Sequence, residues 1–162
     1  MNHPPFMTIE ASGFTDISYP VALSWILSDG SYKSIFIKPE DNWQEWDAGL
    51  ESMLGKSRRD LLDTGESALE VIQELDLDIE QGIVYVEDVP MMEIWLGNLF
   101  DAVGRDIPFE IRSLFDVIPV LDRDSFDEER RFLVESNNMS MNSSEDQILI
   151  LQRIWADFGS SE

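Results

Sequence analysis

Two acidic side chains occupy positions where a carboxylate could do chemistry. Glu10 closes residues 6–10, whose composition is typical of a short buried strand, and Asp146 lies in the first turn of a helix predicted near the end of the chain. Hard divalent cations prefer oxygen ligands, so both residues are candidate metal ligands. Each also has a structural interpretation. Glu10 could accept hydrogen bonds from the backbone of the following turn, and Asp146 could stabilise a helix N-terminus capped by Ser143 or Ser144.

The basic residues gather at Lys56, Arg58 and Arg59, with a second pair at residues 130–131. The first cluster could contact the phosphates of a nucleic acid. It could also balance the acidic residues of the segment 60–66 that follows it. The sequence alone leaves both interpretations of this cluster open.

Composition excludes several kinds of chemistry. The chain contains no cysteine, which excludes disulfides, thiolate metal sites and cysteine nucleophiles. Its formal charge is −22, from 33 acidic and 11 basic residues. Such a surface repels phosphodiesters at long range and offers few cations to release their counterions, so we expect no strong non-specific nucleic-acid binding. A highly solvated surface, adaptation to salt or imitation of nucleic acid could each account for this charge.

The length of 162 residues suits one domain, and we expect residues 1–162 to form it. Hydrophobic residues make up 43% of the chain and aromatic residues 10%, which is typical of a folded protein rather than a disordered one. The sequence shows no signal peptide at its start and no apolar stretch as long as a membrane span. We therefore expect a cytoplasmic protein.

The remaining pattern predicts the strands that position these residues. The Asp-Gly pair at residues 29–30 is a strong hairpin signal, and it separates two β-rich runs at residues 20–27 and 32–38. Together with residues 6–10, these runs predict a three-stranded meander. Residues 83–86 are a continuous apolar run of the kind found in fully buried strands.

Helical patterns alternate with the later strands. A capping box at residues 63–66 predicts the start of a helix that buries Leu69, Ile72 and Leu75. Further predicted elements are a helix over residues 90–103, a short strand at 109–111, and helices over 124–135 and 145–158. This order predicts an α/β domain with a mixed sheet flanked by helices.

The ordered set of motifs resembles the DEDD family of 3′–5′ exonucleases, which includes ribonuclease T and the proofreading subunit of replicative polymerases. The resemblance covers nearly the whole chain and implies a ribonuclease-H-like fold. It rests on residues 9–14 (Ile-Glu-Ala-Ser-Gly-Phe), 18–21 (Ser-Tyr-Pro-Val), the hairpin at 29–30, 54–58 with 61–62, 84–85 and 95–96.

The resemblance also implies where a catalytic site would lie. The family holds two metal ions with an Asp-x-Glu on the first strand, an Asp on the helix after the fourth strand and a final Asp. On the first strand of this chain the Asp position is Thr8, while Glu10 remains. The second-motif Asp falls on Met92. Glu93 is one residue away, and one helical step turns a side chain by about 100°.

The last motif keeps its acid but lacks the family's general base. Asp146 matches the final Asp, whereas the histidine position five residues earlier is Met141 and the alternative tyrosine position is Asn142. His3 is the only histidine in the sequence, and the three tyrosines are all at or before position 85. The base is therefore absent from this part of the sequence, not merely displaced.

From these residues we predict an exonuclease-like pseudoenzyme, whose vestigial site comprises Thr8, Glu10, Met92, Glu93, Met141 and Asp146. We expect it to bind another protein, or weakly a nucleic acid or nucleotide, through the former cleft. The alternative is a residual or altered metal-dependent 3′–5′ exonuclease acting on single-stranded DNA or RNA ends. That enzyme would use Mg²⁺ or Mn²⁺ held by Glu10 and Asp146, aided by Glu93 and by Glu87 or Asp88.

Overall fold

Three antiparallel strands form the centre of the fold. The computed structural model describes residues 3–79 and 82–159. Strands β1 (Met7–Ala11), β2 (Pro20–Ile26) and β3 (Tyr32–Phe36) pair in the order β1-β2-β3. Gly30 lies in the β2–β3 turn at a φ of 91°, a conformation that glycine adopts without steric cost. The predicted meander is confirmed.

A parallel pair of strands extends this sheet. Strands β4 (Ile83–Val86) and β5 (Glu110–Ser113) pair in parallel, and a single bridge between Phe6 and Tyr85 places β4 beside the start of β1. Val84 and Val86 are fully buried, whereas Ile83 and Tyr85 on the other face of β4 are only partly buried, so the strand is not buried throughout as its apolar run predicts. The predicted α/β fold with a mixed sheet is confirmed.

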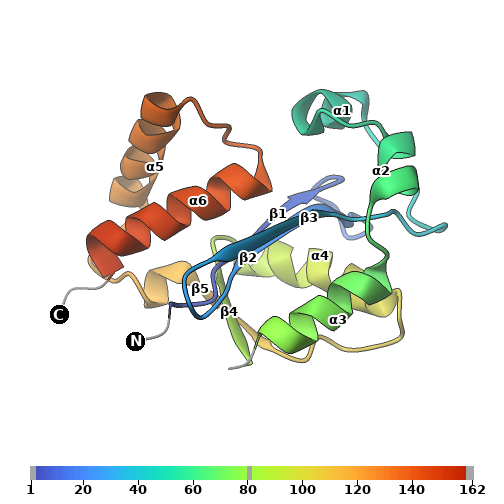
Figure 1. Ribbon diagram of the computed structural model, residues 1–162, viewed down its shortest axis with the longest axis horizontal. Helices are drawn as coiled ribbons and strands as arrows, with labels where there is room; N and C mark the ends of the chain where they lie inside the picture. The colour runs from blue at the N-terminus through green and yellow to red at the C-terminus, as the bar shows by residue number, and fades with distance from the viewer. Residues whose placement is uncertain (1–2, 80–81, 160–162) are drawn as a thin grey trace.

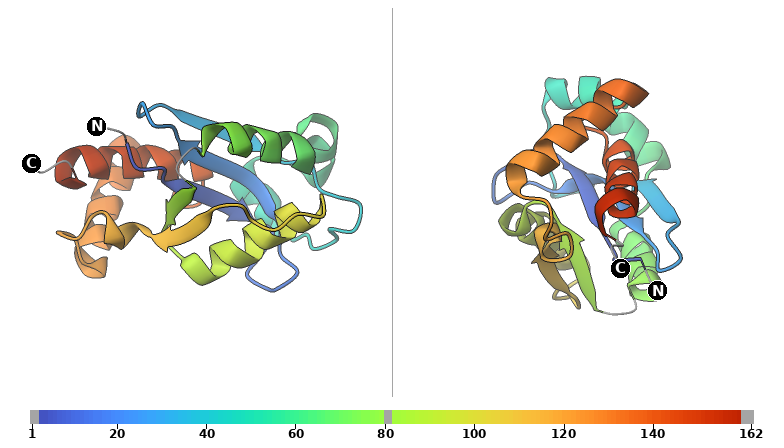
Figure 2. Two further views of the ribbon diagram at one scale, coloured as in Figure 1. Left: turned by 90° about the horizontal axis from the view of Figure 1, so that it is seen from below. Right: turned by 90° about the vertical axis from the view of Figure 1, so that its left-hand side faces the viewer.

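Helices cover both faces of the sheet. The helices are α1 (Ala48–Leu54), α2 (Arg58–Thr64), α3 (Ala68–Asp78), α4 (Val89–Asp101), α5 (Arg123–Asn137) and α6 (Ser144–Ile154), with a 3₁₀ turn at Leu114–Asp116 and a π-helical turn at Trp155–Gly159. Helix α6 crosses β1 and β2 on one side, with α5 across it, whereas α3 and α4 lie on the opposite side (Figures 1 and 2). None of the helices in the described part of the chain is long and apolar enough to cross a bilayer.

The start of α3 corrects the sequence prediction. The capping box consists of Ser67 and Glu70, not of residues 63–66, because the chain up to Thr64 belongs to α2. Ile72 and Leu75 are buried as predicted, but the side chain of Leu69 is 52% exposed. The buried face of α3 consists of Ala68, Val71, Ile72 and Leu75, and Leu69 lies outside it.

Strand β1 runs between two hydrophobic clusters. Met7 belongs to the cluster that β2 forms with α3 and α4, whereas Phe6 belongs to the cluster beneath α5 and α6. All seven residues of β2 are buried, which matches its position in the middle of the sheet. The polar side chains of β1 therefore emerge where the two halves of the core meet.

Candidate functional site

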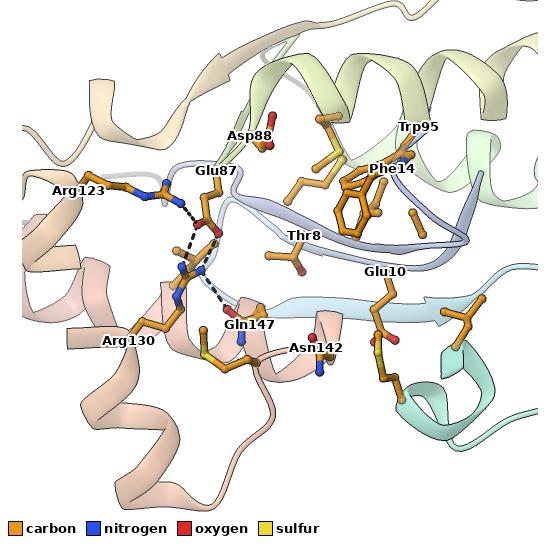
Figure 3. Close-up of a pocket in the computed structure, with 18 residues that line it drawn as sticks. Thr8, Glu10, Phe14, Glu87, Asp88, Trp95, Arg123, Arg130, Asn142 and Gln147 are labelled. Atoms are coloured by element: carbon orange, nitrogen blue, oxygen red, sulfur yellow. Dashed lines mark hydrogen bonds and ion pairs between the residues drawn. The ribbon is translucent and has the colours of Figure 1, made fainter. Parts of the chain in front are cut away.

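A pocket of about 360 Å³ lies beside β1. Its walls come from segments that are far apart in the sequence, and they bring together the predicted positions Thr8, Glu10, Met92 and Met141 (Figure 3). The other lining residues are Met7, Ile9, Ala11, Phe14, Leu50, Met53, Glu87, Asp88, Trp95, Arg123, Arg130, Asn142, Gln147 and Leu151. The volume is at the lower end of the range for ligand pockets, about 300–1,000 Å³.

Glu10 is the most perturbed carboxyl group in this pocket. Its Oε1 accepts a hydrogen bond of 2.8 Å from the Ser144 N–H, while Oε2 is buried without a hydrogen-bond partner among the described residues. Burial raises the pKa of Glu10 to about 7, and the nearby charge of Asp146 also raises it, against the lowering effect of the Ser144 N–H. Burial therefore favours the protonated form of Glu10 relative to an exposed carboxyl group.

Thr8 binds the same residue as Glu10. The Thr8 hydroxyl donates a hydrogen bond of 2.7 Å to the carbonyl oxygen of Ser144, and the Ser144 hydroxyl lies 3.1 Å from that of Ser24 on β2. Ser144 is the first residue of α6 and is only 3% exposed. Two side chains of β1 thus hold both backbone polar groups of one residue, which fixes the start of α6 on the sheet.

The positions where the resemblance requires an acid and a base carry thioethers. Met92 is 4% exposed and lies on the pocket wall formed by α4, whereas Met141 is 49% exposed and lies in the loop before α6. A methionine at either position supplies neither a charge nor an oxygen ligand, and it fills irregular space with flexible apolar packing.

Two of the predicted acids do not line the pocket. Glu93 lies on α4, and its side chain is exposed and does not line the pocket. The Asp146 carboxylate accepts a hydrogen bond of 2.8 Å from the Ser140 N–H, and the Asp146 N–H donates to the hydroxyl oxygen of Ser143, the N-cap of α6. Asp146 thus has the structural position of a first-turn acid, and it acts on Glu10 only through its charge.

An ion-pair cluster occupies the end of the pocket away from Phe14 (Figure 3). The carboxylate of Glu87 accepts hydrogen bonds of 2.6 and 2.9 Å from Arg130 and of 2.7 Å from Arg123. Arg130 also pairs with Asp127 at 3.1 Å, and its side chain is only 12% exposed. The guanidinium groups neutralise Glu87 and leave it poorly placed to bind a cation.

The predicted phosphate-binding cluster lies outside the pocket. Lys56 sits over the ring of Phe36 at 4.8 Å, and Arg59 pairs with Asp63 one helical turn away. Arg58 donates a hydrogen bond of 2.7 Å to the carbonyl oxygen of Trp43. All three residues thus contact groups that lie outside the pocket.

The described residues of the pocket include no histidine or tyrosine. His3 packs against Phe6 and Trp155 with ring centroids 5.6 and 5.8 Å apart, and the Tyr32 hydroxyl donates to Glu145. The pocket therefore lacks the side chains that serve as general base in the family that the sequence resembles.

The donor set does not fit a pair of metal ions. Within residues 3–79 and 82–159, no three histidine or acidic side chains gather closely enough to hold a cation. Divalent cations in two-metal sites need several carboxylate oxygens that converge on them. Here Glu10 is bound to Ser144, and Glu87 is bound to two arginines.

Comparison with solved structures gives the fold a close counterpart. The product-bound structure of exonuclease I matches with a TM-score of 0.62 over 94% of this chain, at 13% sequence identity. The chain has the fold of the part of exonuclease I that it covers. The Escherichia coli exonuclease I complex with a dA16 oligonucleotide matches with a TM-score of 0.63 over 95% of the chain, and the apo enzyme with 0.62 over 94%, at 13% and 14% identity.

The likeness to exonuclease I is one of structure. The chain spans only about two-fifths of the length of these exonuclease I chains, of which the matches cover 43%, 41% and 41%. No protein-family model matches the chain, and no curated protein is detectably similar to it in sequence. Exonuclease I is a DEDD 3′–5′ exonuclease, so the resemblance inferred from the motifs is confirmed at the level of fold.

Sequence reasoning missed the residues that close the two ends of the pocket. Arg123, Asp127 and Arg130 share one face of α5 by their spacing of four and three residues, a signal that marks an ion-pair face. No signal in the sequence around Glu87 identifies it as the ion-pair partner of these arginines. Phe14 was known only as the end of a motif, and its position at the mouth of the pocket depends on how the loop after β1 folds.

Proposed function

We propose that this chain is an exonuclease-like domain whose two-metal site has been lost, and that it works by binding a partner rather than by cleaving a phosphodiester. The observation that carries the proposal is the double hydrogen bond from β1 to Ser144. Thr8 and Glu10 occupy the positions of the Asp-x-Glu pair, and both are engaged with the backbone of α6.

The chemistry of the other positions supports the same proposal. Hydrolysis by two metals needs a water activated by a base and an oxygen cage for both cations. Met92 and Met141 offer neither function, and the pocket includes no histidine or tyrosine among its described residues. Arg130 brings a permanent positive charge into the space beside Glu87, where a cation would be repelled.

One observation favours residual catalysis as the second candidate. Glu10 Oε2 is buried in the pocket wall without a partner in the described part of the chain, so it could take a single cation. Asp88 lines the same pocket, although its side chain already accepts a hydrogen bond from the Met91 N–H. A metal-dependent 3′–5′ exonuclease on single-stranded ends would have to work with these groups.

A nuclease assay separates the two candidates. The full chain is incubated with 5′-labelled single-stranded DNA and RNA in Mg²⁺ or Mn²⁺, beside a Glu10→Ala/Asp146→Ala variant, with exonuclease I as the active control for DNA. We expect no shortening beyond that seen with the double variant. Metal-dependent shortening from the 3′ end that the double variant loses would overturn the non-catalytic proposal.

A further inference from the structure

The loop between β1 and β2 exposes two large apolar side chains. Phe14 is 80% exposed and Ile17 is 66% exposed. Single exposed hydrophobic residues are common, but two within four residues of one short loop form a local apolar surface. These side chains form a preorganised surface only if hydrogen bonds fix the conformation of the loop.

The carboxylate of Glu45 holds the loop from one side. The hydroxyl groups of Ser12 and Ser18 each donate a hydrogen bond of 2.7 Å to Glu45 Oε1, and the Thr15 hydroxyl donates one of 3.1 Å to Oε2. Burial of Glu45 raises its pKa, but these three hydroxyl donors together outweigh that effect, so its pKa lies below the ordinary value. Hydrogen bonds to a charged acceptor are the strong kind, and here they converge from both ends of the loop.

Helix α4 holds the loop from the other side. The indole N–H of Trp95 donates a hydrogen bond of 3.0 Å to the Gly13 carbonyl oxygen, and the Asn98 amide donates to the carbonyl oxygens of Asp16 and Ser18. The backbone on each side of the exposed residues is therefore fixed. Phe14 and Ile17 are presented in a preorganised conformation, which lowers the entropy lost when a partner binds.

The exposed loop is continuous with the pocket. The Phe14 ring lies 5.8 Å from the Trp95 ring (Figure 3). Phe14 lines the pocket together with Met53 and Met141. Met53 is 51% exposed and Met141 49% exposed, whereas Met92 and Trp95 form a buried floor. We call these five residues the Phe14 face. Methionine-rich surfaces adapt to the shape of the side chains they receive.

The elements that form most of this face carry only acidic charges. The loop at residues 12–18, helix α1 and helix α4 contain Asp16, Glu51, Glu93 and Asp101, and they contain no lysine or arginine. The arginines at the other end of the pocket are paired with Glu87 and Asp127. Combined with a net charge of −22, this arrangement attracts a cationic partner and repels both nucleic acid and a second copy of the chain.

We propose that the Phe14 face docks a basic peptide segment of another protein, in which a large apolar side chain is flanked by lysine or arginine. The apolar side chain enters the pocket between Phe14 and Met53, and the flanking cations lie over the acidic residues of the loop and α4. This inference rests on the proposed binding function and names the class of partner.

A displayed library of random linear peptides tests the proposal on the full chain. We expect the enriched peptides to carry a net positive charge and at least one large apolar residue. A synthetic peptide of the enriched sequence should bind more weakly as salt is raised. Its affinity should fall at least about tenfold in a Phe14→Ser/Met53→Ser variant, because these residues form the apolar contact.

The matched control is Leu77→Ser on α3. Leu77 is 78% exposed, close to the value for Phe14, but it does not line the pocket. We expect peptide affinity within about twofold of the wild type in this variant. Circular dichroism and thermal unfolding verify that both variants fold, which the exposure of the replaced side chains favours.

Several outcomes would overturn the docking proposal. These are the enrichment of acidic or uncharged peptides, no enrichment above an unrelated protein, and equal binding to the Phe14→Ser/Met53→Ser variant. Self-association in sedimentation, or binding of a labelled oligonucleotide, would also overturn it if the same variant abolished the interaction. Nuclease activity in the separate assay would instead overturn the proposed function, so the two failures are distinguishable.

Discussion

Glu10 and Ser144 are separated by 134 residues in the chain, yet the Ser144 N–H donates a hydrogen bond of 2.8 Å to the Glu10 carboxyl group. The hydroxyl group of Thr8, on the same strand, donates a second hydrogen bond to the Ser144 carbonyl oxygen. These bonds join the first strand to the last helix at the positions where the resemblance requires metal ligands. Their energetic role is open to direct measurement.

Glu10 should make stability depend on pH. Its pKa of about 7 in the folded protein lies above the ordinary value of 4.5, so folding takes up a proton between these values. The resulting stabilisation is fully present below about pH 4.5 and is lost as the pH rises through about 7. We expect this group to remove about 3 kcal/mol from the free energy of unfolding across that range.

Glu10→Gln isolates this contribution, because the amide imitates the protonated carboxyl group. Urea unfolding over a series of pH values should give a flatter profile for the variant than for the wild type. Glu66 also has a pKa raised to about 7, mainly by its hydrogen bond with Glu74, but this contribution is common to both proteins. Parallel profiles would mean that Glu10 does not titrate as described.

The Thr8 hydroxyl should stabilise the fold through its bond to Ser144. Thr8→Val keeps the shape of the side chain and leaves the Ser144 carbonyl oxygen without this donor, which should cost about 1–2 kcal/mol in urea unfolding at fixed pH. Thr64→Val is the matched control, since the Thr64 hydroxyl donates to the Asp60 carbonyl oxygen at an exposed helix end. A loss no larger than that of the control would contradict a structural role for Thr8.

Divalent cations should stabilise the protein only through its overall charge. Mg²⁺ or Mn²⁺ will screen a surface of charge −22, so some rise in Tm is expected for any variant. We expect the same rise in the wild type and in Glu10→Gln, measured by calorimetry at equal ionic strength. A Mn²⁺-dependent rise confined to the wild type would reveal a cation held by Glu10.

Arg130 should be the most sensitive basic residue. Its side chain is 12% exposed and its guanidinium binds Glu87 at 2.6 Å, so Arg130→Met removes one partner of a largely buried pair and should cost about 2–4 kcal/mol. Adding Glu87→Gln should recover part of the loss, because the Glu87 carboxylate, which then has only Arg123 as a cationic partner, is removed. Urea unfolding of the four proteins of this double-mutant cycle gives the coupling energy.

Arg112→Met is the control for that cycle. Arg112 pairs with Glu110 at 2.9 Å, but both side chains are about half exposed. We expect its removal to change the free energy of unfolding by no more than about 1 kcal/mol, as for other surface pairs. Equal losses for Arg112 and Arg130 would show that burial does not set the strength of the Glu87 cluster.

The strands and most helices could be predicted because their signals are local. The Asp-Gly turn, the apolar run of residues 83–86 and Pro90 each act within a few residues of the structure they specify. The start of α3 was predicted too early because two capping signals, at residues 63–66 and at Ser67, compete within one short segment. Choosing between them requires knowing where α2 ends.

The structural interpretation of Glu10 named the right type of hydrogen-bond donor, a backbone N–H, but the wrong residue. The sequence suggested that its carboxylate could answer a backbone donor in the turn that follows, whereas the donor is Ser144. Similarly, the sequence shows Arg130 as part of a basic pair, but it does not indicate the ion pair between Arg130 and Glu87. Such contacts join residues whose separation in the chain carries no signal of their proximity.

The sequence by itself determined the three-stranded meander, the acidic charge and the chemical groups available at each position of the former site. It therefore established that Thr8, Met92 and Met141 carry no acid or base. The tertiary structure alone decided that Thr8 and Glu10 bind Ser144, that two arginines share Glu87, and that Phe14 projects from a fixed loop. Hydrophobic periodicity and capping act along the chain, whereas a hydrogen bond across the fold exists only when packing brings its donor within about 3 Å of its acceptor.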